Sequence, residues 1–315
     1  MANIENFTFP SSYNERPVAG YIATCADVKP RAIFQITHGM AEHWMRYAPF
    51  AGFLAQRGYV VCGHDDLGHG QTSADEYPDG FFAPKDGDQH VVNDIHKMTS
   101  LAKESYPGLP LILFGHSMGS FFARWACELW HDEIYAAIYC GTGGANPAAA
   151  AGMALTALLS AISGPEHKSK LVDRLAFGAY QKRIPRPRTN FDWLSANEEN
   201  VDKYIRDPKC GFLFSVGAFH DMMKVMRHVN SEQWSLSIRK DMPILIIAGE
   251  EDPVGNYGKG PREVAEGLKS REVHSVDIKL YPKMRHEILN EADRQTVWED
   301  ILLWCDKRIN DAARA

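Results

Sequence analysis

Ser117 is a candidate nucleophile because of the residues around it. It lies in the sequence G-H-S-M-G at 115–119, which follows an apolar, strand-like run at 111–114 and precedes a helix-compatible run at 121–130. A G-x-S-x-G turn between a strand and a helix is the context that exposes a nucleophilic serine. The two glycines let strand, turn and helix approach closely. An ordinary turn with a surface serine has the same five residues, so the motif alone leaves both interpretations open.

Two further residues could activate this serine. A neutral hydroxyl is a weak nucleophile and needs a base within hydrogen-bond reach. His286 lies in the loop after the strand pattern at 275–281, and an imidazole titrates near neutral pH. Asp252 follows the strand pattern at 243–249 and could hold the imidazole tautomer and stabilise its charged form. Together with Ser117, these residues predict attack on an acyl group.

Neighbouring residues compete for both roles. Glu250 and Glu251 adjoin Asp252, and Glu251 is the alternative acid. His274 is the alternative base, but it precedes the last strand pattern and would lie at the opposite end of a parallel sheet. The sequence therefore favours Asp252 and His286, and it leaves Glu251 open.

Backbone N–H groups are expected to stabilise the negative charge that develops on the acyl oxygen. The N–H of Met118, directly after the serine, is one predicted donor. The second donor should come from the loop after the apolar strand pattern at 32–37, where Met40 in His38-Gly39-Met40 is the best candidate. Met40 and Met118 therefore form the predicted oxyanion hole.

The elements that must position these residues alternate along the first part of the chain. Short apolar runs typical of buried strands occur at 32–37, 59–62, 111–114 and 134–140. Helix patterns lie between them at 46–57, 91–106 and 121–130. This alternation predicts an α/β fold with a mostly parallel central sheet and helices on both faces. Since the carboxyl ends of parallel strands meet at one edge, Ser117, Asp252 and His286 should lie together there.

A second region breaks the alternation. From 141 to 237 there is no clear buried strand, and helix patterns dominate until a strand pattern returns at 243–249. We interpret this region as a helical cap insertion. It divides the chain into a first core part (1–140), the cap insertion (141–237) and a second core part (238–315). The alanine-rich run at 148–162 suits either packing against the core or a groove for an acyl chain.

Five short motifs together resemble a known family. They are G-x-x-E-H at 39–43, D-x-x-G-H-G at 65–70, G-H-S-M-G at 115–119, G-x-x-D-x-V at 249–254 and H-E at 286–287. In this combination the chain resembles the monoglyceride lipase/lysophospholipase branch of the α/β-hydrolases, whose members are often labelled serine aminopeptidase domain proteins. Ser120 departs from the glycine that usually follows Met-Gly in this family.

The resemblance implies an enzyme that cleaves monoacylglycerols, lysophospholipids or simple carboxylic esters through an acyl-enzyme intermediate, beneath a helical cap. An aminopeptidase or amidase would use the same triad but would need carboxylates for a free α-amino group. Such carboxylates are available in the insertion at Asp192, Glu198, Glu199 and Asp202. Acyl transfer to an alcohol or thiol other than water is a related alternative. A binding protein that reuses the fold normally lacks a triad residue, and none is missing here.

Composition restricts the partners of the chain. Its 315 residues are 45% hydrophobic and 23% charged, and the net charge is −6. This balance argues against a nucleic-acid surface, which needs a basic face. We expect no cofactor, and the expected partner is a small acyl ester. The apolar run at 148–162 is too short to span a bilayer, so we expect transient lipid contact through the cap and no stable membrane insertion.

No metal site is expected from the sequence. Histidines near the loops are His38, His43, His64, His69 and His116, with Asp65 and Asp66 beside them. None belongs to a helical H-x-x-x-H or H-E-x-x-H motif. The six cysteines include no C-x-x-C pair, which predicts free thiols in a reducing compartment. Residues 1–10 lack a basic segment followed by an apolar one, so we expect a cytoplasmic protein.

Overall fold

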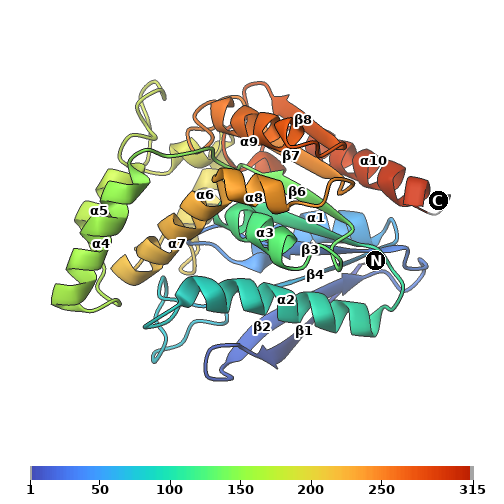
Figure 1. Ribbon diagram of the computed structural model, residues 1–315, viewed down its shortest axis with the longest axis horizontal. Coiled ribbons are helices and arrows are strands. Elements are labelled where there is room, and N and C mark those ends of the chain that lie inside the picture. Colours follow the sequence, from blue (N-terminus) through green and yellow to red (C-terminus); the bar gives the residue numbers. More distant parts are fainter. Residues whose placement is uncertain (1, 313–315) are drawn as a thin grey trace.

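An eight-stranded β-sheet runs through the centre of the protein in this computed structural model, which describes residues 2–312 and the side chains of 2–310 (Figure 1). The strand order is β1-β2-β4-β3-β5-β6-β7-β8. The strands are β1 (Asn3–Pro10), β2 (Pro17–Thr24), β3 (Ala32–Thr37), β4 (Tyr59–His64), β5 (Leu111–His116), β6 (Ala136–Cys140), β7 (Ile244–Gly249) and β8 (Val276–Tyr281). The pairs β1–β2 and β2–β4 are antiparallel, and all pairs from β4 to β8 are parallel. This topology confirms the predicted mostly parallel sheet.

Helices cover both faces of the sheet. On one face lie α1 (Ala48–Ala55) and α10 (Arg294–Ala312), and on the other lie α2 (Gly87–Ser105), α3 (Met118–Leu129) and α9 (Lys259–Ser270). In β5, Leu111 and Leu113 pack in the hydrophobic core under α2, α3 and α9, whereas Ile112 and Phe114 pack in the core under α1 and α10. Because side chains of a strand alternate between faces, a strand buried on both sides is a continuous apolar run. This explains why these strands could be recognised in the sequence.

The helix predicted at 46–57 is split in the structure. A short 3₁₀ turn covers Trp44–Tyr47, and α1 begins at Ala48 with Pro49 in its first turn. Proline lacks an N–H and is tolerated in the first turn of a helix but not in its interior. Pro49 therefore sets the start of α1.

Five helices lie between β6 and β7. They are α4 (Ala149–Ser163), α5 (Lys170–Phe177), α6 (Glu198–Arg206), α7 (Val216–Val229) and α8 (Glu232–Ser237). α7 packs against α2 and α3 and carries α4 on its other side. In Figure 1, α4 and α5 project from the left-hand side of the molecule. The sequence did not predict α8, a short helix whose first turn is capped by Ser231.

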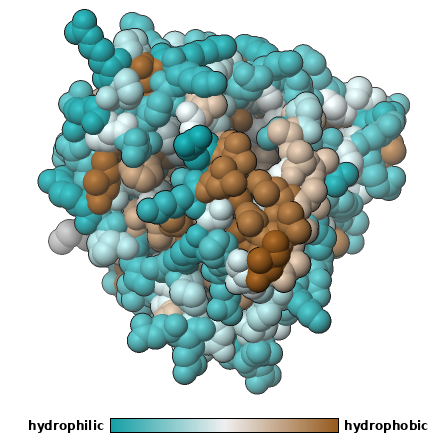
Figure 2. All heavy atoms as spheres, turned by 90° about the vertical axis from the view of Figure 1, so that its left-hand side faces the viewer, coloured by the Kyte–Doolittle hydropathy of each residue, from teal (hydrophilic) through white to brown (hydrophobic). Residues whose placement is uncertain are grey.

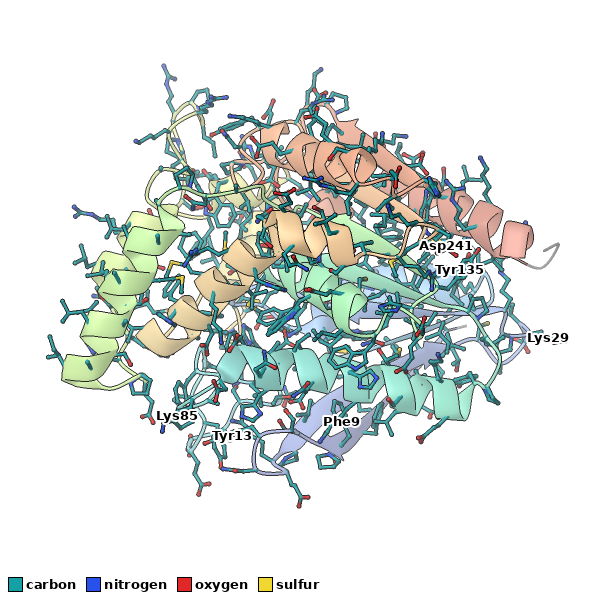
Figure 3. All side chains as sticks on the ribbon, in the orientation of Figure 1. Phe9, Tyr13, Lys29, Lys85, Tyr135 and Asp241 are labelled. Atoms are coloured by element: carbon teal, nitrogen blue, oxygen red, sulfur yellow. The ribbon has the colours of Figure 1, made fainter. Side chains whose placement is uncertain are left out.

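The carboxyl ends of the parallel strands face these inserted helices. Lys29, Tyr135 and Asp241 precede β3, β6 and β7, and all three are labelled on the right-hand side of Figure 3. Lys85, in the loop between β4 and α2, is labelled on the side of α4 and α5. The loops that follow the strands therefore open towards the inserted helices.

No helix within residues 2–312 is both long enough and apolar enough to cross a membrane. All six cysteines are free thiols, as the sequence predicted.

Candidate active site

Ser117 lies at a sharp turn between β5 and α3. Its backbone has φ 52° and ψ −119°, a conformation that costs free energy for a residue with a side chain. A Cβ atom at Gly115 would lie 2.3 Å from the carbonyl oxygen of Gly119, and one at Gly119 would lie 2.4 Å from that of Thr37. Both positions therefore require glycine. The turn leaves Ser117 half-buried at the N-terminus of α3.

His286 and Asp252 form a buried pair. Nδ1 of His286 lies 3.0 Å from Oδ2 of Asp252, and the two residues are 2% and 0% exposed. The backbone N–H of Val254 donates to the other oxygen of Asp252 at 2.8 Å. Burial lowers the pKa of His286, but the negative charge of Asp252 and the hydrogen bond to it outweigh burial, so the pKa is raised.

The end of β6 brings Ser117 and His286 together. The N–H of Ser117 donates to the carbonyl oxygen of Cys140 at 2.9 Å. A Cβ atom at Gly141, the next residue, would lie 3.0 Å from Cε1 of His286. Ser117 and His286 therefore flank the same two residues, although they are far apart in the sequence.

The loop after β3 lies against Ser117 and is fixed by side chains. A Cβ atom at Gly39 would lie 3.3 Å from that of Ser117. The N–H of Gly39 donates to Glu42 at 2.6 Å, and the N–H of Ala41 donates to Nε2 of His69 at 3.2 Å. Between them, the N–H of Met40 has no hydrogen-bond partner among the described residues. This donor is available to a substrate next to Ser117.

His69 and His38 support this loop through hydrogen bonds. Burial and the neighbouring His38 lower the pKa of His69 to about 4. Its Nδ1 lies 3.0 Å from the carbonyl oxygen of Leu67, so Nδ1 carries the proton and Nε2 accepts from Ala41. His38 has the same arrangement, with Nδ1 at 2.8 Å from the Gly39 oxygen and Nε2 accepting from an amide. These two histidines therefore hold the backbone of the loops after β3 and β4 in place.

A buried arginine joins two carboxylates beside the site. Arg46 donates to Glu42 at 2.5 Å and to the two oxygens of Glu287 at 2.6 and 2.7 Å. From α6, Asn200 also donates to Glu287, at 2.6 Å. Burial opposes both charges, yet their attraction raises the pKa of Arg46 and lowers that of Glu42. We call Glu42, Arg46, Glu287 and Asn200 the charge network.

The charge network connects the inserted helices to the predicted site. Glu287 directly follows His286, and Glu42 holds the amide of Gly39. Sequence reasoning included Glu42 and Glu287 as motif residues but missed Arg46 and Asn200. The four-residue spacing of Glu42 and Arg46 is a helix-pair signal, whereas no local pattern indicates Asn200.

Trp193 is a second residue that sequence reasoning missed. Its ring centroid lies 5.3 Å from that of His286, and the ring of Tyr180 lies 5.0 Å from Trp193. Burial and the charge of Asp252 raise the pKa of Tyr180, so its hydroxyl is neutral. These aromatic rings from the inserted segment cover the histidine on its outer side.

The alternative residues lie apart from this arrangement. Glu251 is exposed, and its carboxylate lies 3.9 Å from Arg285. His274 is exposed, and its N–H bonds to the carbonyl oxygen of Lys240. The structure thus brings Asp252, and not Glu251, to His286.

The other predicted oxyanion donor, Met118, is the first residue of α3. Backbone N–H groups at this position have no partner within the helix, so the N–H of Met118 is not used by the helix itself.

The sheet, the turn at Ser117 and the strand-end pair are those of an α/β-hydrolase. The family model for "Serine aminopeptidase, S33" matches residues 28–293. The chain therefore belongs to this family, and it is a hydrolase.

Similar proteins span nearly the whole chain. A monoacylglycerol lipase from Mycolicibacterium smegmatis is 26% identical over 282 residues, or 88% of this chain and 89% of that one. Human monoglyceride lipase is 26% identical over 294 residues, or 91% of this chain and 86% of that one. The crystal structure of a thermostable carboxyl esterase from Bacillus coagulans, in complex with glycerol, is 30% identical with a TM-score of 0.90. It covers 97% of this chain and 99% of that chain.

Proposed function

We propose that this protein is a serine hydrolase that cleaves carboxylic esters, with Ser117 as nucleophile, His286 as base and Asp252 as the acid that supports it. The observation that carries the proposal is the buried His286–Asp252 pair, which meets the strained serine turn at the end of β6. Such strain persists only where the surrounding structure fixes it, typically at functional sites. We take carboxylic esters as the substrate class because the similar proteins are named as monoglyceride lipases and a carboxyl esterase.

The reaction follows from this arrangement. Oγ of Ser117 attacks the acyl carbon and gives its proton to Nε2 of His286. The N–H groups of Met40 and Met118 donate to the resulting oxyanion. His286 returns the proton to the departing alcohol, and the acyl group remains on Ser117. Water, deprotonated by His286, then releases the acid. Asp252 stabilises the imidazolium in both steps.

The segment 141–237 is the proposed cap, inserted between core parts 1–140 and 238–315. Several apolar side chains on its outer helices are largely exposed, and they form the outer patch: Leu158, Ile162, Leu171 and Leu175, at 58, 72, 52 and 66%. Figure 2 shows apolar side chains gathered on this side of the molecule. A patch of this kind on a protein surface marks an interaction site.

The outer patch supports transient contact with a lipid surface. The substrates that we propose are monoacylglycerols, lysophospholipids or simple esters. The printed names of two relatives are those of monoacylglycerol-cleaving enzymes. Six free thiols support a reducing compartment such as the cytoplasm.

An aminopeptidase is less well supported, although the family name contains that word. Asp192 accepts hydrogen bonds from the amides of Arg188 and Thr189 and from the Thr189 hydroxyl, so it closes a turn. Glu199 pairs with Lys203 on the exposed surface of α6. Glu198 and Asp202 lie against Arg188. The carboxylates that could bind an α-amino group are thus engaged elsewhere.

Active-site labelling tests the proposal. A fluorophosphonate should modify the wild-type protein at Ser117, and Ser117→Ala should abolish both labelling and hydrolysis of p-nitrophenyl esters. Ser100→Ala, which removes a hydroxyl from α2 far from the strand ends, is the matched control and should keep both. Ester hydrolysis that survives in Ser117→Ala would overturn the assignment. Faster turnover of aminoacyl amides than of matched esters would favour the aminopeptidase.

A further inference from the structure

Three side chains with different donor atoms converge outside the proposed catalytic site. Within the described part of the chain, one ligand atom each from His43, Asp207 and Cys210 lies within 4.8 Å of the other two. Nε2 of His43 and Oδ2 of Asp207 are 2.9 Å apart. Imidazole nitrogen, carboxylate oxygen and thiolate sulfur are the ligands that Zn²⁺ takes in proteins. The sequence did not predict this group, because it joins His43 to a turn 164 residues away.

A tight turn presents two of the three donors. Asp207, Pro208, Lys209 and Cys210 form it, with the N–H of Cys210 bonded to the carbonyl oxygen of Asp207 at 3.1 Å. Proline at the second position preorganises such a turn. The N–H of Lys209 donates to Oδ1 of Asp207 at 2.9 Å, which leaves Oδ2 directed at His43. A hydrogen bond to the second oxygen is how proteins orient a metal-binding carboxylate.

Backbone bonds also fix the turn relative to His43. The N–H of Gly211 and the hydroxyl of Tyr204 both donate to the carbonyl oxygen of Ala41, each at 2.9 Å. Ala41 lies two residues before His43. The fold therefore already holds the imidazole of His43 opposite the turn, and a metal ion would not have to bring the two together.

The neighbouring guanidinium does not block a cation at these three donors. Arg46 is already held by Glu42 and Glu287, so it does not compete for Asp207.

We propose that His43, Asp207 and Cys210 form a Zn²⁺ site that ties the segment after α6 to the loop after β3. Water supplies the fourth ligand, because all three side chains are partly exposed. Tetrahedral bonds of about 2.0–2.3 Å place donors about 3.3–3.8 Å apart, so the separations between donors need to change by about 1.5 Å at most. Binding releases the thiol proton of Cys210 to solvent, and the imidazole proton of His43 moves to Nδ1.

Occupancy would connect two regions that the proposed reaction uses. His43 lies three residues after Met40, and Asp207 directly follows the helix that contributes Asn200 to the charge network. A metal ion bridging them would hold the inserted segment against the loop that carries Met40.

Cobalt spectroscopy tests the site without any measurement of activity. The full chain, with any purification tag removed and under a phosphine reductant, is titrated with Co²⁺. We expect one equivalent of Co²⁺ to give a thiolate-to-cobalt charge-transfer band. Zn²⁺ should then displace the Co²⁺ and remove the band. Cys210→Ser should abolish the band. Cys25→Ser, at the other half-exposed cysteine, is the matched control and should keep it.

Zinc affinity gives an independent measurement. We expect Asp207→Asn, which keeps the shape of the turn, to weaken Zn²⁺ binding at least about tenfold in a chelator competition. Zn²⁺ should raise the melting temperature of the wild-type protein and of Cys25→Ser but not that of Cys210→Ser. A wild-type protein without the cobalt band, or a band that survives in Cys210→Ser, would overturn the proposal. Neither result would bear on the proposed ester hydrolysis.

Discussion

The strand-end rim and the outer helices of the inserted segment are built in opposite ways. At the rim, Asp252, His286, Glu42 and Glu287 are all at most 3% exposed, and every one has a charged or hydrogen-bonded partner. On α4 and α5, buried residues are few: Ala149, Thr156 and Val172. Polar bonds have preferred directions and fix geometry, whereas apolar contact is not directional. We therefore expect the rim to determine the rate of the proposed reaction, and the outer helices to determine which surface the protein meets.

This contrast predicts the largest effect for Asp252. We expect Asp252→Asn to reduce kcat about 10⁴-fold for short and long esters alike, because the amide no longer stabilises the imidazolium and favours the wrong tautomer. Steady-state kinetics on p-nitrophenyl acetate and a long-chain ester would measure it. Glu251→Gln, one residue earlier and exposed, should leave both rates within about twofold. A loss in Glu251→Gln equal to that in Asp252→Asn would contradict the assignment.

Arg46 tests whether the charge network supports the rim. Arg46→Met leaves the buried carboxylates of Glu42 and Glu287 without their cation, and we expect the free energy of unfolding to fall by about 3–5 kcal/mol. Lys203→Met breaks the exposed pair with Glu199, which has the same four-residue spacing as Arg46 and Glu42. That control should cost less than about 1 kcal/mol. Urea denaturation compares the two, and equal losses would show that burial of the network is unimportant.

The pH dependence gives a third test. His286 accepts a proton only when neutral, so kcat/KM should rise with pH as His286 deprotonates. Because Asp252 raises the pKa of His286, the midpoint of this rise should lie above about 6.5, the ordinary value for histidine. In Asp252→Asn, the residual activity should rise at a lower pH. A wild-type midpoint below that of the variant would contradict the role of Asp252.

The outer patch should give the smallest effect. The double substitution Leu158→Ser and Ile162→Ser removes the two members of the patch that lie on α4. We expect binding to phosphatidylcholine vesicles and hydrolysis of a long-chain monoacylglycerol to fall by up to about 30-fold, since each of the two lost side chains contributes about 1 kcal/mol of apolar burial. Rates on p-nitrophenyl acetate and the pH profile should not change. Leu303→Ser on α10, which is 67% exposed, is the matched control.

The sequence could predict the rim because its signals are local. Strands buried on both faces are apolar runs, so β5 and β7 were found close to their observed bounds. The polar residues that follow such strands were then few enough to single out Asp252 and His286. Turn chemistry at 115–119 is equally local, because the two glycines are needed for close approach within the turn itself.

The features that were missed depend on contacts between distant parts of the chain. Arg46 and Glu287 are 241 residues apart, and nothing in either neighbourhood indicates the other. Helix α2 begins at Gly87, four residues before its predicted start. A Cβ at Gly87 would lie 2.4 Å from the Asp221 carboxylate, so the packing of α7 against α2 favours glycine at this position. Because glycine disfavours helix on its own, the local sequence predicts a later start.

The backbone at Ser117, the proposed nucleophile, limits how stable an active form of this protein is expected to be. A residue with a side chain at φ 52° and ψ −119° costs about 1–3 kcal/mol, and glycine at this position would remove most of that cost, less about 0.5–1 kcal/mol for its greater freedom in the unfolded chain. We therefore expect Ser117→Gly to melt at a higher temperature than the equally inactive Ser117→Ala. Selection for thermostability alone would favour losing the whole side chain of Ser117, so a search for more stable variants must screen for turnover as well as for folding.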